Sequence, residues 1–321
     1  MAISRNRDYS MTGTIAITGA TGFIGSALIE RLVATGRQIQ ALVRPASAHK
    51  RPVNGAVQWI KGDLEDSESL RQLVHGADVI IHCAGIVRGA TREQFNRVNV
   101  DGVARLAQAV SKQQPVPRFL LISSLAAREP QLSAHAASKQ QGERMLMDSS
   151  GNAEWTVFRP TAVYGPGDRE IMPVLRWMAR GVAPLMGTGN GRFSFIYIAD
   201  LVDAIVQWLD CRLIQRGTYE LHDGNPAGYS WHDIVDVVAG LRGAPVVRLK
   251  IPVSMVKLTA ALNIAFARAV GYAPMLTPGK VRELTHTDWT VDNAAICQDI
   301  GWSPKIKLAE GLRRTLGLNH N

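Results

Sequence analysis

Short apolar runs alternate with stretches of helical periodicity from residue 14 to residue 160. Several runs are apolar on both faces, which is typical of strands in a parallel sheet covered by helices on both sides. Between the first two runs, Ile24, Leu28 and Leu32 recur at helical spacing and predict a helix that ends at Gly36. The predicted strands cover 14–18, 38–43, 57–61, 78–83, 118–123 and 155–159.

Further helices complete this pattern. Asp66 or Ser67 can cap a helix that carries Leu70 and Leu73, and residues 98–110 have helical periodicity as well. The alternation predicts an α/β fold, a Rossmann-type doubly wound parallel sheet with right-handed crossovers.

After Pro160 the alternation loosens. Glycine-rich loops appear, and helices are predicted over 200–209, 230–241 and 254–270. No linker composition separates two independent units. We therefore expect one lobe over 12–165 and a smaller, mainly helical lobe over 166–321 that lines a cleft, with some segments of the second returning to the first.

A glycine-rich turn follows the first predicted strand and opens the first helix. Gly19 permits the tight turn, Gly22 lets the backbone approach a diphosphate, and Gly25 lets helix and strand pack closely. The helix N-terminus then offers free N–H groups to the anion. The first lobe is therefore predicted to bind a dinucleotide, with contacts from Gly19, Thr21, Gly22, Phe23, Ile24 and Gly25.

The end of the second predicted strand bears on the choice of dinucleotide. NAD-binding proteins usually place Asp or Glu there, whereas this chain has Arg44 followed by Pro45. A guanidinium can clamp a 2′-phosphate, which a carboxylate would repel. We expect NADP(H), with NAD(H) as the alternative if Arg44 is only a solvated loop residue.

Asp63 and Leu64 follow the third predicted strand. The carboxylate of Asp63 can accept a hydrogen bond from the adenine amino group. The alternative is that Asp63 caps the next helix.

Composition excludes several classes of function. The net charge of +9 comes from 36 Lys and Arg scattered among 27 Asp and Glu, so we expect no nucleic-acid partner and attribute the excess to an anionic cofactor and to solubility. Three cysteines without a CxxC motif exclude a disulfide scaffold and a zinc ribbon, and no metal-ligand spacing occurs. A reducing, cytoplasmic location is expected.

Residues 251–272 form the most apolar stretch of the chain. Lys257 and Arg268 interrupt it, so no uninterrupted run reaches the ~18 residues that a membrane span needs, and we expect no stable span. We predict a half-buried helix of the second lobe, with one face packed against the core. A helix lying on a membrane surface is the alternative.

The ordered motifs resemble those of the extended short-chain dehydrogenase/reductase family, the NAD-dependent epimerase/dehydratase group. Within it, the chain looks closest to dihydroflavonol reductases and 3β-hydroxysteroid dehydrogenases. The resemblance runs over nearly the full length and rests on residues 18–25, 62–64, 82–85, 98–100, 122–124, 159–166, 192–200, 300–304 and 311–315.

The resemblance implies roles for further residues. Ala84 and Gly85 would line the adenosine side of the cofactor, and Pro160 to Val163 would pass close to the nicotinamide. Asn99 would support the active site from its helix. Ser124 stands where the family hydrogen-bonds the substrate oxygen, and family members often form homodimers.

The active-site motif departs from the family pattern. The family has Tyr-x-x-x-Lys, in which Tyr transfers a proton while Lys lowers its pKa and binds the nicotinamide ribose. Here Lys139 and its neighbour Ser138 are present, but His135 replaces the tyrosine. His135 shares a helical face with Lys139 and can transfer a proton. Otherwise Tyr164 or a water supplies the proton, or the protein is catalytically silent.

Three functions follow. The chain is predicted to be an NADP(H)-dependent oxidoreductase that transfers hydride to or from a carbonyl or secondary alcohol of a small molecule, with Ser124, His135 and Lys139 as catalytic residues. A nucleotide-sugar epimerase or dehydratase is the first alternative. A non-catalytic NADP(H)-binding scaffold or redox sensor is the second.

Overall fold

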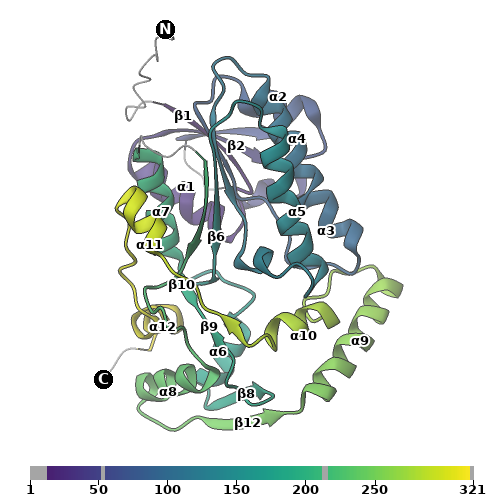
Figure 1. Ribbon diagram of the computed structural model, residues 1–321, viewed down its shortest axis with the longest axis vertical. Coiled ribbons are helices and arrows are strands. Elements are labelled where there is room, and N and C mark those ends of the chain that lie inside the picture. The colour runs from purple at the N-terminus through teal and green to yellow at the C-terminus, as the bar shows by residue number, and fades with distance from the viewer. Residues whose placement is uncertain (1–12, 52–54, 212–215, 319–321) are drawn as a thin grey trace.

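Seven parallel strands form the central sheet, in the order β11-β6-β5-β4-β1-β2-β3. The structure is a computed structural model that describes residues 13–51, 55–211 and 216–318 (Figure 1). This order reverses between β1 and β4, which confirms the doubly wound sheet. The strands are β1 (Thr14–Thr18), β2 (Gln38–Val43), β3 (Val57–Lys61), β4 (Val79–His82), β5 (Arg118–Ile122), β6 (Trp155–Pro160) and β11 (Gly217–Leu221).

Helices cover both faces of the sheet, because alternate strand residues point in opposite directions. Ile15 and Ile17 pack toward α1 and α7, whereas Ala16 between them packs toward α2 and α4. This arrangement explains why the strands are apolar on both faces. The helices are α1 (Phe23–Ala34), α2 (Ser67–Val74), α3 (Arg92–Asn99), α4 (Asp101–Ser111), α5 (Ala134–Ser149) and α7 (Ile198–Asp210), with short 3₁₀ turns at η1 (Pro45–Lys50) and η2 (Leu125–Arg128).

The helix predicted over 98–110 is two helices in the structure. They meet at Val100, whose φ of −113° and ψ of −65° break the regular turn. Packing accounts for the break: a Cβ on Gly142 of α5 would lie 2.1 Å from the Asn99 carbonyl oxygen, so α5 presses against the backbone at this point.

The remaining elements build the second lobe. They are β7 (Ala162–Tyr164), α6 (Met172–Ala179), β8 (Val182–Met186), β9 (Arg192–Phe193), β10 (Phe195–Tyr197), α8 (Trp231–Arg242), β12 (Val247–Ile251), α9 (Val253–Val270), α10 (Pro278–Leu284), β13 (Asp288–Trp289), α11 (Ala294–Ile300) and α12 (Leu308–Leu316). β11 returns to the first lobe and pairs with β6 at the edge of the sheet.

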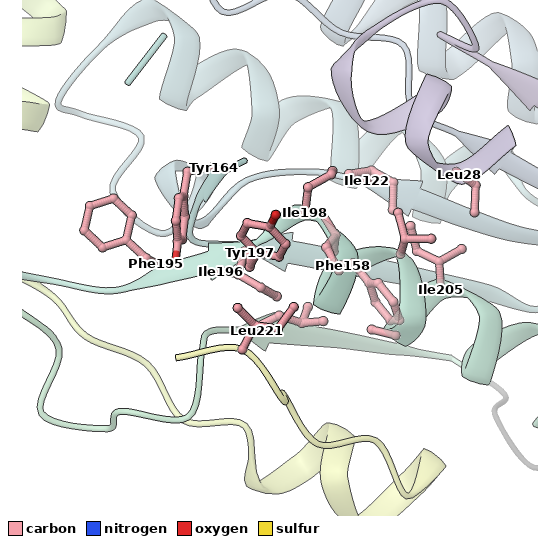
Figure 2. Close-up of a cluster of buried hydrophobic side chains, with 14 of the residues drawn as sticks. Leu28, Ile122, Phe158, Tyr164, Phe195, Ile196, Tyr197, Ile198, Ile205 and Leu221 are labelled. Atoms are coloured by element: carbon pink, nitrogen blue, oxygen red, sulfur yellow. The ribbon is translucent and has the colours of Figure 1, made fainter. Parts of the chain in front are cut away.

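The two lobes share one hydrophobic core. A single buried cluster extends from Leu28 of α1, through Ile205 of α7, to Val238 of α8. Figure 2 shows its middle, where Tyr164 and Phe195 lie beside the sheet residues. The second lobe is thereby fixed against the carboxyl ends of the strands.

Residues 251–272 form a helix of the second lobe as predicted, but it is less buried than the half-buried helix that the sequence favoured. In α9 only Val256, Ala260 and Ala267 are buried, against Val281 of α10 and its neighbours. Five other large apolar side chains of α9 are exposed, while Val253 and Ile264 are partly buried. Figure 1 shows the helix at the rim of the molecule between β12 and α10.

Candidate active site

The glycine turn between β1 and α1 has the geometry that its sequence predicts. Gly19 has a φ of +69°, and a Cβ there would lie 2.5 Å from the backbone nitrogen of Ala84. A Cβ on Gly25 would lie 2.2 Å from the Gly19 carbonyl oxygen. Only glycine fits either position without moving the backbone.

The start of α1 offers hydrogen-bond donors to an anion. Gly22 is the N-cap and provides no side-chain cap, so the first N–H groups of the helix, including those of Phe23 and Ile24, have no intrahelical partner. Thr21 and Gly22 are partly or fully exposed. These residues fit the diphosphate of a dinucleotide.

Two polar side chains follow the next strands at the same sheet edge. Arg44 is exposed directly after β2, and its guanidinium has no hydrogen-bond or ion-pair partner among residues 13–51, 55–211 and 216–318. Asp63 lies after β3 beside Leu64, and its Oδ1 accepts only the N–H of Glu65, at 3.2 Å. The helix cap belongs to Asp66, which leaves the second oxygen of Asp63 free.

The ends of β1 and β4 are tied together beneath the turn. His82 is fully buried, and its Nδ1 lies 2.7 Å from the Thr18 hydroxyl oxygen, which also accepts the N–H of Ala84 at 3.4 Å. Burial lowers the pKa of His82 to about 3, so this imidazole is neutral and serves as packing.

Lys139 lies where the ends of β4 and β5 meet. Its Nζ donates to the Ile122 carbonyl oxygen at 3.3 Å, and a Cβ on Gly85 would lie 2.9 Å from that nitrogen. Burial lowers the pKa of Lys139 to about 8, while the Glu143 carboxylate acts in the opposite direction. The ammonium is therefore charged at neutral pH and faces the Gly85 backbone.

Asn99 connects three parts of the site, as predicted for a supporting residue. Its Oδ1 accepts the N–H of Ile86 at 2.9 Å, and its Nδ2 donates to the Ile86 carbonyl at 3.0 Å and to the Ser138 hydroxyl at 2.9 Å. Ser138 in turn donates to the His135 carbonyl at 2.7 Å. The loop after β4 is thereby fixed to the first turn of α5.

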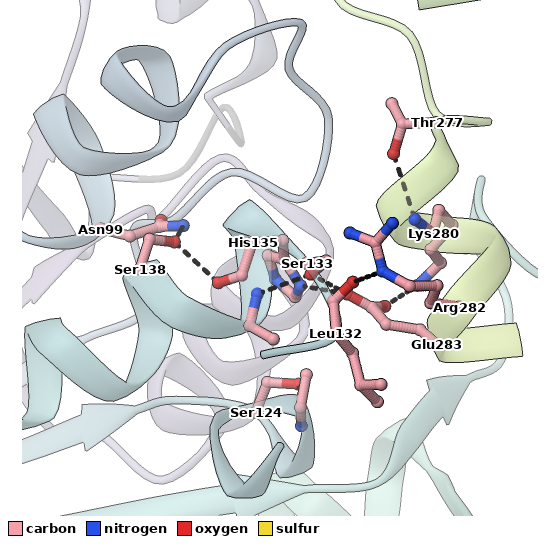
Figure 3. A network of polar contacts seen from close by, with 12 residues as sticks. Asn99, Ser124, Leu132, Ser133, His135, Ser138, Thr277, Lys280, Arg282 and Glu283 are labelled. Atoms are coloured by element: carbon pink, nitrogen blue, oxygen red, sulfur yellow. Dashed lines mark hydrogen bonds and ion pairs between the residues drawn. The ribbon is translucent and has the colours of Figure 1, made fainter. Parts of the chain in front are cut away.

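His135 sits in that first turn and faces α10 (Figure 3). It is 8% exposed, and its Nδ1 lies 3.6 Å from Oε1 of Glu283. Neither ring nitrogen has a hydrogen-bond partner among the described residues. Burial lowers the pKa of His135 below its ordinary value, while Glu283 acts in the opposite direction.

Glu283 is a buried carboxylate that the sequence alone did not indicate. Its Oε2 accepts from Lys280 at 2.8 Å, and the hydroxyl of Ser133, the N-cap of α5, donates to its Oε1. Burial raises the pKa of Glu283, but its contacts with His135 and Lys280 outweigh burial and hold that pKa at about 2. Glu283 is therefore ionised beside His135.

Ser124 and Tyr164 lie in contrasting surroundings. Ser124 is partly exposed after β5, and its Oγ accepts the N–H of Ala126 at 3.2 Å (Figure 3). The alternative that Tyr164 supplies the proton is wrong, because its ring is fully buried and its hydroxyl points to the Leu308 carbonyl oxygen, 3.5 Å away. Burial also raises the pKa of Tyr164.

Pro160 and Val163 flank the short connection from β6 to β7. Thr161 between them is anchored to the Leu221 carbonyl oxygen by its N–H at 3.0 Å and by its hydroxyl at 2.9 Å. The segment predicted to pass the nicotinamide is thus held at the carboxyl edge of the sheet.

A cavity of about 320 Å³ adjoins His135. Its walls come from the start of α3 with Phe95, from the start of α5, and from α9 and α10 with Ile264, Arg268 and Glu283. Within residues 13–51, 55–211 and 216–318, no group of three or more His, Cys, Asp or Glu is arranged to hold a metal ion. The cavity is thus lined by His135 and by residues from both lobes, while the glycine turn, Ser124 and Lys139 are not part of its walls.

Comparison with known proteins agrees with this geometry. A family model described as "NAD dependent epimerase/dehydratase family" matches residues 15–217. A ceramide reductase of Caulobacter vibrioides is 36% identical over 95% of this chain and 93% of its own length. The mitochondrial NADH dehydrogenase [ubiquinone] 1 alpha subcomplex subunit 9 of Arabidopsis thaliana is 26% identical, over 93% of this chain and 76% of its own.

Solved structures show the same fold. UDP-glucuronic acid 4-epimerase from Bacillus cereus, in complex with UDP-glucuronic acid and NAD, superposes with a TM-score of 0.74. It is 19% identical, and the match covers 95% of this chain and 98% of that one.

Proposed function

This chain belongs to the NAD-dependent epimerase/dehydratase family and is an NAD(P)-dependent oxidoreductase of the extended short-chain dehydrogenase/reductase type, and from this premise we propose that it is an NADP(H)-dependent reductase of a carbonyl on an acyl-chain molecule. The observation that carries the proposal is the buried ammonium of Lys139 against Gly85, at the strand ends shared by the glycine turn and Ser124. The similarity to a ceramide reductase supports the substrate class.

The cofactor preference is argued from Arg44. The free guanidinium follows β2 at the position where an NAD-binding protein would present a carboxylate to the ribose. A 2′-phosphate there gains a charge-assisted hydrogen bond without breaking an existing ion pair. Arg44 is therefore the residue that favours NADP(H) over NAD(H).

Bound NADP(H) supplies the hydride that adds to the carbonyl carbon. Lys139, whose ammonium lies close to the backbone of Gly85, would hold the ribose side of the bound cofactor. Ser124 offers its hydroxyl to the substrate oxygen, which gains the electron pair of the carbonyl. That oxygen needs one proton to become an alcohol.

His135 is the group that supplies this proton. The Glu283 carboxylate faces Nδ1 and stabilises the imidazolium form, while Nε2 is buried without a hydrogen-bond partner among the described residues. The substrate oxygen would become that partner on binding in the cavity that adjoins His135. Glu283 is a positioning residue in this scheme: it orients the ring and opposes the lowering of the His135 pKa by burial.

The test follows NADPH oxidation over a panel of ketones with short and long acyl chains. Wild type is expected to turn over a long-chain ketone, and His135→Ala to lower kcat by about 10²-fold or more with NADPH affinity unchanged. Lys139→Met serves as the inactive control. If wild type and His135→Tyr both bind NADPH but reduce no carbonyl, the proposed function is refuted.

A further inference from the structure

One face of α9 is apolar and has no partner in the structure. We name it the α9 stripe, and its side chains are between 57% and 62% exposed. They recur at intervals of three or four residues, so they project from one side of the helix. The α9 stripe consists of Met255, Leu258, Leu262, Phe266 and Val270.

The polar residues of α9 are arranged around this stripe. Lys257 and Arg268 fall on the opposite side of the helix axis. Thr259 lies within the stripe, but its hydroxyl donates to the helix carbonyls of Met255 and Val256, at 3.0 and 2.9 Å. The exposed face is thus apolar with its polar groups satisfied.

The segment around α9 is strongly basic. From residue 237 to residue 282 the chain contains seven Lys or Arg and no Asp or Glu: Arg242, Arg248, Lys250, Lys257, Arg268, Lys280 and Arg282. Large parts of this segment are exposed, including Val247 and Leu249 of the strand that leads into α9. Asp236 pairs with Arg248, and Glu283 pairs with Lys280, so five cations of the segment have no ion-pair partner among the described residues: Arg242, Lys250, Lys257, Arg268 and Arg282. An apolar face beside these five cations is complementary to a surface that is apolar inside and anionic outside.

Both ends of α9 are fixed to the same folded body. Before the helix, Ile251 pairs with Met186 of β8, and after it Glu283 of α10 bonds to Ser133 of α5. The helix has 18 residues and a mean hydropathy of 1.4, enough by length and composition to cross a bilayer. Crossing would require one of its ends to leave these contacts, so the helix is placed to lie along a membrane.

A second copy of the chain is a poorer occupant. In a symmetric dimer the same patch meets itself, so the basic segment of one protomer would face that of the other. Like charges across an interface oppose association, whereas anionic lipid headgroups neutralise the cations.

We propose that the α9 stripe docks the protein on the surface of a bilayer that contains anionic lipids, with α9 parallel to the membrane plane. Ile264 and Arg268 of the same helix line the cavity that contains His135. These two residues lie on the side of α9 opposite the stripe, so the cavity is behind the helix as seen from the membrane, and a substrate with an acyl chain would reach it from the bilayer by passing around α9. This second step rests on the proposed function, while docking does not.

Vesicle flotation tests the docking. The vesicles contain equal parts of phosphatidylglycerol and phosphatidylcholine, or phosphatidylcholine alone, and no substrate is needed. Wild type is expected to float with the anionic vesicles, and the triple variant Leu258→Gln/Leu262→Gln/Phe266→Gln to partition about 100-fold less. The changed side chains are exposed, so circular dichroism should show an intact fold.

Two further variants separate apolar from electrostatic binding. Lys250→Gln/Lys257→Gln should lose about fivefold in affinity per charge on anionic vesicles only. Met147→Gln, which changes an apolar residue on α5 that is 38% exposed, should float like wild type.

Docking is overturned if wild type binds no vesicle or if the triple variant floats as well as wild type. It is also overturned if neither protein floats while ultracentrifugation finds wild type to be a dimer and the triple variant a monomer, because the stripe is then a dimer interface. The proposed function fails separately. If flotation follows the expected pattern but no carbonyl is reduced, docking stands and the reductase does not. If the triple variant reduces a water-soluble ketone normally but loses turnover of a vesicle-borne one, substrate entry from the bilayer is supported.

Discussion

The same substitution at two helical glycines should have opposite effects on stability. Gly25 lies buried in the first turn of α1, where an added Cβ would be 2.2 Å from the Gly19 carbonyl oxygen and 2.9 Å from the Ala20 Cα. Gly240 is exposed near the end of α8, where an added Cβ meets nothing within 4 Å. Gly240→Ala measures only the general preference of helices for alanine, whereas Gly25→Ala also measures the cost of the close contact between the two backbones.

The magnitudes follow from the contacts. Alanine gains up to about 1 kcal/mol over glycine in a helix, and this full gain is expected at Gly240. At Gly25 the helix must move by ~1 Å, and overpacking of this kind costs about 1–3 kcal/mol. The Gly19 carbonyl cannot yield easily, because it also accepts the N–H of Gly22 at 2.9 Å. We expect Gly25→Ala to be destabilised by about 2 kcal/mol after the helical gain is subtracted.

Thermal unfolding followed by circular dichroism measures both variants. Gly25→Ala should lower Tm by about 4 °C, and Gly240→Ala should raise it by about 2 °C. The displaced turn should also weaken NADPH binding at least about tenfold in Gly25→Ala and leave it unchanged in Gly240→Ala. Equal stability and equal NADPH affinity of Gly25→Ala and wild type would refute the close contact between α1 and the turn.

Further predictions concern the charged residues of the site. Because burial lowers the pKa of Lys139 from 10.5 to about 8, the folded chain binds the proton of Lys139 less tightly than the unfolded chain. Lys139 therefore lowers the free energy of unfolding, by the full amount below pH 8 and by progressively less as the pH rises toward 10.5. Lys139→Met should therefore abolish turnover while raising the free energy of unfolding at pH 7 by up to about 3 kcal/mol, measured in urea. Glu283 raises and Lys280 lowers the pKa of His135, so Glu283→Gln should move the pH profile of kcat to lower pH and Lys280→Met to higher pH; shifts of the same sign would contradict the assignment. Arg44→Ala should weaken NADPH binding by about 10- to 100-fold and leave NADH binding unchanged in a calorimetric titration.

The sheet and the cofactor turn were predictable because their signals are local. The strand runs carry their apolar faces within four to six residues, and Gly25 is required by a backbone contact inside a single turn. The cofactor roles of Lys139 and Gly85 were implied only by the family resemblance, which did not place the two residues side by side. Arg44 is exposed at the end of β2, but its preference for a phosphate stays a prediction.

The surroundings of His135 were not predictable. Glu283 reaches the start of α5 from a helix that lies 150 residues further along the chain than Ser133, and no local pattern signals that contact. Periodicity did predict the helix now seen as α9, but periodicity does not say what an apolar face meets. The absence of Asp and Glu between residues 237 and 282 was the available sign that this helix differs from a core helix.

The pairing of β11 with β6 has a consequence for protein production. The last strand of the sheet is supplied by residues 217–221, long after the other six have been synthesised. A recombinant fragment that stops near residue 165 would expose the hydrogen-bonding edge of β6, which is an open template for another chain. Such a fragment should aggregate during expression, whereas one extended through Leu221 closes that edge.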